Sequence, residues 1–315
     1  MKSVIVGVGA SLPKKVVTND DLSKMVETSD EWIKKRTGIA ERHIAEKHET
    51  TSLLATQAAE RALLDAGLSA KDIDLVVVGT VTPDYTFPSV ATLIQRNLGI
   101  EQGAAFDVSA ACSGFLYALD IADSYIKLGK AKNALVIGAE TFSKIIDWGD
   151  RSTCVLFGDG AGAVVLQAQE NTNKGIISSR IFADGRYADS LITTGGVSFN
   201  QIAGTVTMDG REVFKHAVEK MKAAVDSLLN STNCSINDVD LLIPHQANAR
   251  IISMLAEQMQ LPENRVVISV DKHANTSAAT IPLAMDTVKE QLQNKTILLV
   301  AMGAGFTWGA SLIRM

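Results

Sequence analysis

The sequence is short of the features that mark several protein classes. Its three cysteines, Cys112, Cys154 and Cys234, are widely spaced and form no C-x-x-C pair, so neither a disulfide framework nor a zinc site is indicated. No apolar stretch reaches the ~18 residues that a membrane-spanning helix needs. These absences together predict a soluble, cytoplasmic protein with no bound metal.

Concentrated charge of one sign is missing as well. The formal net charge is -5 over 315 residues, without any block of like charges, which argues against nucleic acid as the main partner. Gly7 and Gly9 lack the third glycine of a dinucleotide-binding fingerprint, because Leu12 occupies that position. What remains is a chain with 46% hydrophobic residues, enough to bury a large core.

The apolar pattern alternates between strands and helices, which predicts βαβ units and a mostly parallel sheet. In the first half, helices are expected at 51–66 and 88–98 and in one or two short pieces within 19–35, where Asp20, Asp21 and Ser29 can act as caps. Strands are expected at 4–8, 73–79, 104–108, 133–138, 153–157 and 162–166.

The second half repeats this order. The segment Ser69-Ala-Lys-Asp-Ile-Asp-Leu-Val76 has a close counterpart in Ser235-Ile-Asn-Asp-Val-Asp-Leu-Leu242, displaced by 239 − 73 = 166 residues. The elements expected to follow are a helix at 249–259 and strands at 266–270, 296–300 and 307–313. An internal repeat of this kind predicts two duplicated halves, residues 1–170 and 171–315, in a layered α/β/α/β/α fold.

Cys112 is expected at a strand–turn–helix junction, where the helix N-terminus would favour a thiolate over a thiol. A lone cysteine is more often a buried core residue, so its role depends on what lies opposite. The repeat supplies that information. Asn275 lies in the loop that matches the Cys112 turn, and His245 lies at the strand end that matches Gly79. We therefore expect the three side chains to meet at the strand ends of one shared cleft.

A cysteine with a histidine and an asparagine allows two chemistries. In a protease-type acyl transfer, the histidine would take the thiol proton. In a thioester condensation, Cys112 would hold an acyl group while His245 and Asn275 donate hydrogen bonds to a second thioester as carbon dioxide leaves. The condensation requires a neutral His245 with a proton on Nε2. Backbone N–H groups of Cys112 and of the Gly303-Ala-Gly305 loop could bind the oxyanion.

Four motifs occur in order along the chain: Ala110-Ala-Cys112-Ser-Gly-Phe115, Pro244-His-Gln-Ala-Asn248, Asn275-Thr-Ser-Ala-Ala279 and Gly303-x-Gly-Phe-Thr-Trp-Gly309. On these motifs the whole chain resembles the thiolase superfamily, and in particular the β-ketoacyl-acyl carrier protein synthase III family. The resemblance implies a thiolase-like five-layer fold, acylation of Cys112 by acetyl-CoA or a short acyl-CoA, and decarboxylating condensation with malonyl-acyl carrier protein, without a cofactor. It also implies a homodimer. A related synthase that uses another starter, or a thioester hydrolase, is the alternative.

The resemblance also implies roles for the surrounding residues. The oxyanion donors would be the backbone N–H groups of Cys112 and Ala304, and the adenine of CoA would stack between Trp32 and Arg151. Phe87 would reach across the dimer interface. The implied CoA site comprises Thr28, Trp32, Arg36, Arg151, Met208, Phe214, Ala247 and Asn248, and the implied acyl pocket comprises Phe87, Phe142, Phe157, Leu191 and Val206.

A basic patch is expected beside this site. Arg211, Lys215 and Lys222 fall on one helix face, and Arg250 stands near the start of another helix. Such a patch would suit an acidic carrier protein. Glu257 and Gln258 occupy positions where the resembled family often has lysines, so docking would depend on the remaining basic residues.

Overall fold

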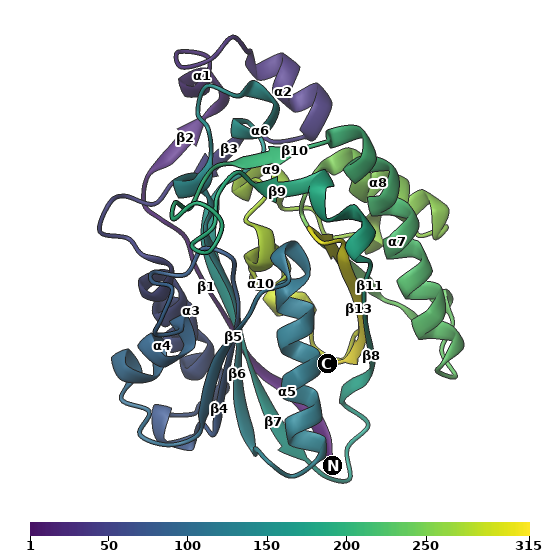
Figure 1. Cartoon of the computed structure of the whole chain (residues 1–315). Coiled ribbons are helices and arrows are strands. Elements are labelled where there is room, and N and C mark those ends of the chain that lie inside the picture. Colours follow the sequence, from purple (N-terminus) through teal and green to yellow (C-terminus); the bar gives the residue numbers. More distant parts are fainter.

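The computed structural model describes all 315 residues and contains two similar β-sheets (Figure 1). The first has the strand order β1-β7-β6-β4-β5 and the second the order β11-β12-β13-β8. The strands are β1 (Lys2–Ser11), β4 (Leu75–Gly79), β5 (Ala104–Val108), β6 (Asn133–Thr141), β7 (Asp159–Gln169), β8 (Gly175–Ala183), β11 (Leu241–Pro244), β12 (Thr296–Gly303) and β13 (Thr307–Arg314).

The two sheets have the same topology, which agrees with the internal repeat. The order β1-β7-β6-β4 matches β8-β13-β12-β11, and in each sheet the second strand of this order is antiparallel to both of its neighbours. Only β4–β5, β4–β6 and β11–β12 are parallel pairs, so the expectation of mostly parallel sheets was wrong. The division between residues 170 and 171 stays a prediction.

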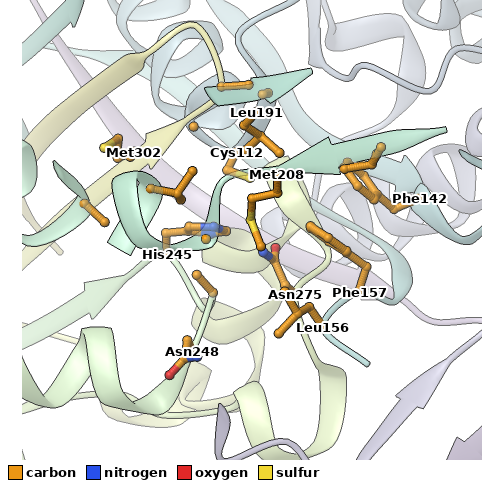
Figure 2. A pocket seen from close by; sticks show the side chains of 18 of the residues that line it. Cys112, Phe142, Leu156, Phe157, Leu191, Met208, His245, Asn248, Asn275 and Met302 are labelled. Carbon is orange, nitrogen blue, oxygen red and sulfur yellow. The ribbon is translucent and has the colours of Figure 1, made fainter. Parts of the chain in front are cut away.

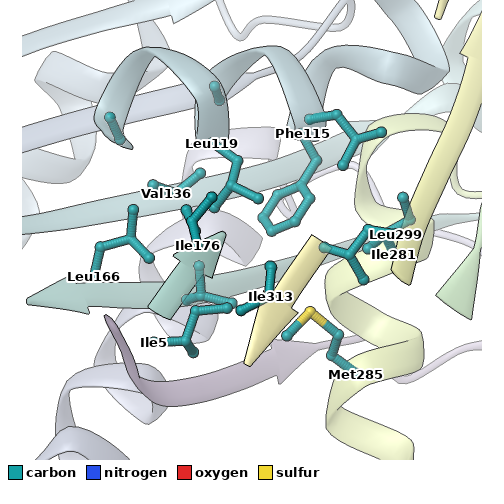
Figure 3. Packing of buried hydrophobic residues seen from close by; sticks show 14 of the residues in the cluster. Ile5, Phe115, Leu119, Val136, Leu166, Ile176, Ile281, Met285, Leu299 and Ile313 are labelled. Carbon is teal, nitrogen blue, oxygen red and sulfur yellow. The ribbon is translucent and has the colours of Figure 1, made fainter. Parts of the chain in front are cut away.

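Helices complete the five layers (Figure 1). Between the two sheets lie α5 (Gly114–Lys127) and α10 (Thr280–Thr287). The outer face of the first sheet is covered by α3 (Thr51–Ala66) and α4 (Val90–Leu98), and that of the second by α7 (Gly210–Asn230) and α8 (Ala249–Gln258). Figure 3 shows the central core, where Phe115 and Leu119 of α5 pack between side chains of both sheets. The predicted fold class is confirmed.

The packing of α3 explains the glycines of β1. The helix begins after Thr50, whose side chain accepts the Leu53 N–H, and ends at Gly67 in the left-handed conformation (φ 65°). A Cβ atom at Gly7 would lie 2.2 Å from the Ala62 carbonyl oxygen of α3. Gly7 is therefore required for close contact between helix and strand, rather than for binding a nucleotide.

Two local expectations were wrong. Residues 153–157 do not form a strand: Asp150 accepts the Ser152 N–H and starts the short helix α6 (Arg151–Cys154). Residues 266–270 are not a strand either, because the Gln246 side chain accepts the Ser269 N–H and Val266 makes only an isolated bridge. The first helix, α1 (Asn19–Leu22), begins after Thr18, and the Asp21 side chain accepts the Thr18 N–H in a capping box, so the expected capping role of Asp21 is confirmed.

Shorter elements lie at the end of the molecule away from the chain termini (Figure 1). Ser29 caps α2 (Asp30–Thr37), as expected, and Val270 opens the short helix α9 (Val270–His273). No helix combines the length and apolar character needed to cross a membrane. The remaining short strands in this region are β2 (Val16–Thr18), β3 (Glu41–His43), β9 (Leu191–Thr193) and β10 (Val206–Met208).

Candidate active site

One mostly apolar cavity of about 370 Å³ is lined by residues from both halves of the chain. Cys112, His245 and Asn275 all line it, and Figure 2 shows their side chains gathered around the same space. They are nearly inaccessible, with exposed fractions of 6%, 4% and 7%. The structure therefore brings together the three residues that the internal repeat had paired.

Cys112 lies in a tight turn just before α5. The turn, Ala111–Ser113, begins with Ala111 at φ 44°, and the Ser113 hydroxyl donates to the Ala110 carbonyl oxygen at 2.8 Å. Gly303 of β12 approaches so closely that a Cβ there would lie 2.6 Å from the Cys112 nitrogen. Ala304 lines the cavity next to Cys112, so both predicted oxyanion residues border the space where a Cys112-bound acyl group would lie.

The protonation state of Cys112 differs from the expectation. Burial raises the pKa of its thiol to about 12; the neighbouring Ser277 side chain lowers the pKa and the nearby Glu140 charge raises it. Desolvation of the charged form thus outweighs the favourable field of the helix N-terminus. The resting side chain is a thiol, and the predicted thiolate was wrong.

His245 follows β11 directly and is held from two sides. Its backbone N–H donates to the Val300 carbonyl oxygen at 2.8 Å, and its Nδ1 lies 2.7 Å from the Thr280 hydroxyl. Burial lowers the pKa of the imidazole to about 3, so the ring is neutral, as the condensation requires. The Thr280 oxygen also lies 3.0 Å from the Ser277 carbonyl oxygen.

This pair of contacts links the His245 tautomer to one hydroxyl proton. When Thr280 donates to Ser277, its oxygen accepts Nδ1–H and leaves a lone pair on Nε2. When Thr280 donates to Nδ1 instead, Nε2 carries the ring proton. His245 therefore changes from an acceptor to a donor on the cavity side only when the ring proton is exchanged from Nδ1 to Nε2 and the hydroxyl rotates to donate to Nδ1.

Asn275 is fixed by backbone pairing with the segment around Phe157. Its N–H donates to the Leu156 carbonyl oxygen at 2.9 Å, and its carbonyl oxygen accepts the Gly158 N–H at 3.0 Å. The Oδ1 atom accepts the Ser277 N–H at 2.8 Å. Because Oδ1 is engaged, the Nδ2 group remains as a donor for a ligand in the cavity.

Glu140 is a member of this site that the sequence analysis did not identify. It is fully buried in β6 and accepts hydrogen bonds from the Val81 N–H and from the Thr82 and Ser277 hydroxyls. Burial raises the pKa of its carboxyl group to about 7. The only signal in the sequence is one charged residue two positions beyond the strand expected at 133–138. Glu140 joins the loop after β4 to the loop that carries Asn275.

The residues implied for CoA binding divide between two places. Met208, Phe214, Ala247 and Asn248 line the cavity. Trp32, Arg36 and Arg151 line a surface hollow of about 340 Å³ that shares Leu156, Gly210 and Asn248 with the cavity. The hollow thus adjoins the cavity where α2, α6 and α7 approach one another. Thr28 lines neither space.

The predicted adenine position is closed in this structure. The Arg151 guanidinium carbon lies 4.8 Å from the centre of the Trp32 ring, and that of Arg36 lies 4.5 Å from it. A flat base between two stacked groups needs about 7 Å, twice an ordinary carbon–carbon contact. Arg151 also donates to the Glu27 carbonyl oxygen at 2.8 Å, so it would have to release that contact to admit adenine.

Four of the five residues implied for the acyl pocket line the cavity. Phe142 and Phe157 stack with ring centres 4.3 Å apart, and Leu191 and Val206 lie beside the same space. Phe87 is 84% exposed and lies outside the cavity of its own chain. Several further residues line the cavity although their sequence pattern is that of ordinary core: Ile145, Leu156, Ala217, Met221, Ile251 and Met302.

The expected basic patch is smaller than the sequence suggested. Arg211 and Lys215 are exposed on α7, and Arg250 is exposed on α8 with its guanidinium carbon 5.4 Å from the centre of the Phe214 ring. Lys222 is paired with Asp226 at 2.6 Å, so its charge is largely compensated. Three basic side chains near the cavity entrance remain without an ion-pair partner.

Two duplicated mixed sheets around a central helix pair, with a cysteine facing a neutral histidine and an asparagine, define a condensing enzyme of the thiolase type. The 3-oxoacyl-[acyl-carrier-protein] synthase III family model matches residues 106–185, and its C-terminal companion matches residues 229–315. The chain belongs to the 3-oxoacyl-[acyl-carrier-protein] synthase III family.

Individual relatives match over the full length. The chain is 55% identical to the β-ketoacyl-[acyl-carrier-protein] synthase III of Rhodospirillum centenum, with 100% of this chain and 99% of the relative covered. It is 51% identical to that of Ehrlichia canis with the same coverage. The crystal structure of 3-oxoacyl-[acyl-carrier-protein] synthase III from Aquifex aeolicus superposes with a TM-score of 0.95, at 49% identity over 99% of this chain and 100% of that one.

Proposed function

We propose that this chain catalyses the decarboxylating condensation of acetyl-CoA, or a short acyl-CoA, with malonyl-acyl carrier protein, the step that initiates fatty-acid synthesis. The observation that carries the proposal is the meeting of Cys112, His245 and Asn275 in one apolar cavity. No aspartate, glutamate, lysine or arginine lines that cavity. The reaction uses two thioesters and needs no cofactor.

In the first half-reaction, Cys112 Sγ attacks the carbonyl carbon of the acyl-CoA. With Thr280 donating to Ser277, the Nε2 lone pair of His245 accepts the thiol proton as the sulfur attacks, because burial keeps both the thiol and the imidazole neutral beforehand. The oxyanion accepts the N–H groups of Cys112 and Ala304. The carbon–sulfur bond of the acyl-CoA breaks, and the departing CoA thiolate takes the proton from His245.

In the second half-reaction, the ring proton of His245 has exchanged from Nδ1 to Nε2 and Thr280 donates to Nδ1. The thioester oxygen of the malonyl group then accepts hydrogen bonds from His245 Nε2–H and Asn275 Nδ2–H. The carbon–carbon bond to the carboxylate breaks, carbon dioxide leaves, and the electron pair forms an enolate that the two donors stabilise. The enolate carbon attacks the acyl carbonyl, the carbon–sulfur bond to Cys112 breaks, and the Cys112 thiolate takes one proton from solvent. An apolar cavity favours decarboxylation because this step converts a charged carboxylate into neutral carbon dioxide.

The direct test measures both products with the purified protein. Acetyl-CoA and malonyl-acyl carrier protein should give carbon dioxide and 3-oxobutanoyl-carrier in equal amounts, with a transient acetyl group on Cys112 seen by mass spectrometry. Release of free acetate without carbon dioxide would contradict the proposal and indicate a thioester hydrolase. A strong preference for a branched or aromatic starter would indicate a related synthase instead.

We propose that Arg211, Lys215 and Arg250 dock the acidic carrier protein. Arg250→Ala should raise the KM for malonyl-carrier several-fold at low salt, with the difference shrinking as salt screens the charges. Lys222→Ala is the matched control, since Lys222 is already paired with Asp226. Equal effects of the two variants would contradict this docking site.

We further propose a homodimer that works in the cytoplasm. Phe87 and Tyr85 lie on one loop and are 84% and 61% exposed, and exposed apolar side chains of this size are typical of an interface. All three cysteines are free, which suits a reducing compartment. Analytical ultracentrifugation should give twice the 33.6 kDa chain mass, and Phe87→Asp should shift the protein to the monomer.

A further inference from the structure

The cavity has two apolar ends on opposite sides of Cys112. Figure 2 shows Phe142 and Phe157 on one side and Met302 on the other, with Cys112 between them. The two ends belong to different parts of the core, because Phe142 and Phe157 pack with residues of the α2 and α6 region. The opposite end packs with the second sheet. We call this end the methionine arm, formed by Ala217, Met221, Ile251 and Met302.

The methionine arm follows one face of α7 inward from the cavity entrance. Gly210, Phe214, Ala217 and Met221 are spaced at helical intervals and all line the cavity. From Phe214 to Met221 the helix rises about 10 Å, at 1.5 Å per residue. That distance is similar to the length of an extended eight-carbon chain.

Across the arm from α7 stands β12. Leu298, Val300 and Met302 share one face of this strand, and this face packs against α7 and α8. The next residue, Gly303, lies against the Cys112 backbone. The arm therefore opens directly beside the position of an acyl group on Cys112.

The two ends differ in stiffness. The stacked rings of Phe142 and Phe157, 4.3 Å apart and inclined by 20°, form a wall with few alternative rotamers. Met221 and Met302 are unbranched and flexible, and methionine adapts its shape to different apolar ligands. All four side chains of the methionine arm are apolar, so the arm suits a hydrocarbon chain.

We propose that the methionine arm is a subsite for the hydrocarbon tail of straight-chain acyl primers of about six to eight carbons bound to Cys112. Acetyl needs only the space beside Cys112, whereas a longer tail would extend between α7 and β12. This inference rests on the proposed function and adds a determinant of chain length on the side of the cavity opposite Phe142.

The test compares kcat/KM for octanoyl-CoA with that for acetyl-CoA, together with mass spectrometry of acylated Cys112. Ala217→Leu narrows the arm and should lower the octanoyl-to-acetyl ratio about tenfold or more, since each displaced methylene of the substrate costs about that much. Met302→Ala widens the arm and should raise the ratio. If Ala217→Leu fails to fold, Met302→Ala carries the test alone.

Val206→Leu narrows the opposite end of the cavity, where Val206 lines the space beside Phe142, and we expect it to lower the octanoyl-to-acetyl ratio less than Ala217→Leu does. The inference is overturned if wild-type Cys112 accepts acetyl but not octanoyl, or if Val206→Leu alone lowers the ratio. It is also overturned if the arm variants lower kcat/KM equally for octanoyl-CoA and acetyl-CoA, so that the ratio does not change. That result would mean that pantetheine occupies the arm. Failure of acetyl to acylate Cys112 would instead contradict the proposed function itself.

Discussion

The two halves of the molecule use one framework for opposite parts of the chemistry. Ala111 and Ser277, 166 residues apart (277 − 111 = 166), both have positive φ, 44° and 51°, and both begin a tight turn that leads into a central helix. At the next position the first half carries Cys112 and the second carries Ala278. The nucleophile belongs to one half, and the histidine and asparagine donors belong to the other.

A second pair of matched positions shows how the difference is built. In the first half, Gly79 packs against Gly114 so closely that a Cβ at Gly79 would lie 2.4 Å from the Gly114 carbonyl carbon. The same positions in the second half, displaced by the same 166 residues, are His245 and Thr280, which form a hydrogen bond of 2.7 Å. The two halves thus share one framework and differ at these two positions. With glycines there, the strand end packs against helix backbone; with His245 and Thr280 there, the strand end carries an imidazole held by a hydroxyl.

Removing the nucleophile should have the largest effect. Cys112→Ser should reduce condensation by about 10³-fold or more, because a serine hydroxyl has no comparably acidic proton and no adjacent base strong enough to activate it. Product formation by mass spectrometry measures this. Cys234→Ser removes a thiol outside the cavity and serves as control. Comparable loss in both variants would contradict the assignment of Cys112.

Removing the imidazole should separate the two half-reactions. His245→Ala should lower decarboxylation of malonyl-carrier by about 10²- to 10⁴-fold, while acylation of Cys112, in which His245 only relays a proton, should slow less. Carbon dioxide release and acylated Cys112 are measured separately. Because the pKa of His245 is lowered to about 3, the ring stays neutral and its titration should be absent from the wild-type decarboxylation profile between pH 5 and 8. Intact decarboxylation in the variant would contradict the role.

The hydrogen bond that replaces the glycine contact offers a finer test. Thr280→Val keeps the shape of the side chain but removes the hydroxyl that bonds His245 Nδ1, so we expect a loss of about tenfold in decarboxylation. Thr287→Val on the same helix removes a hydroxyl that bonds only the Ala284 carbonyl oxygen and is the control. Equal rates in the two variants would show that Thr280 does not position His245.

The last expected effect is on stability rather than on rate, and it concerns the buried carboxyl group that joins the halves. The pKa of Glu140 is raised from 4.5 to about 7, so the folded state binds more protons than the unfolded state between these values and loses stability as pH rises through them. The loss is at most about 3 kcal/mol at 1.36 kcal/mol per pKa unit. Urea unfolding at pH 4.5 to 8 should show this decline in the wild type and a weaker one in Glu140→Gln. Identical pH profiles of stability in the wild type and in Glu140→Gln would contradict the contribution of Glu140.

Much of the framework was predictable because it depends on local patterns. The helix at 51–66 has its expected bounds because a capping threonine and a left-handed glycine fix its ends. The segments at 153–157 and 266–270 were mispredicted because a capping aspartate and a distant glutamine side chain took the backbone groups that a strand would have used. The repeat paired Cys112 with His245 and Asn275 because a duplicated fold brings equivalent strand ends to one cleft.

The sequence by itself determined the duplicated five-layer fold, the three residues that meet and the family, since periodicity, repeats and motifs are properties of the chain order. Only the tertiary structure decided the protonation states, the role of Glu140, the closed stack of Trp32 and Arg151, and the second arm of the cavity. These depend on burial and on contacts between residues far apart in the chain. Desolvation keeps Cys112 protonated and His245 neutral, and no local pattern specifies how much water a folded site excludes.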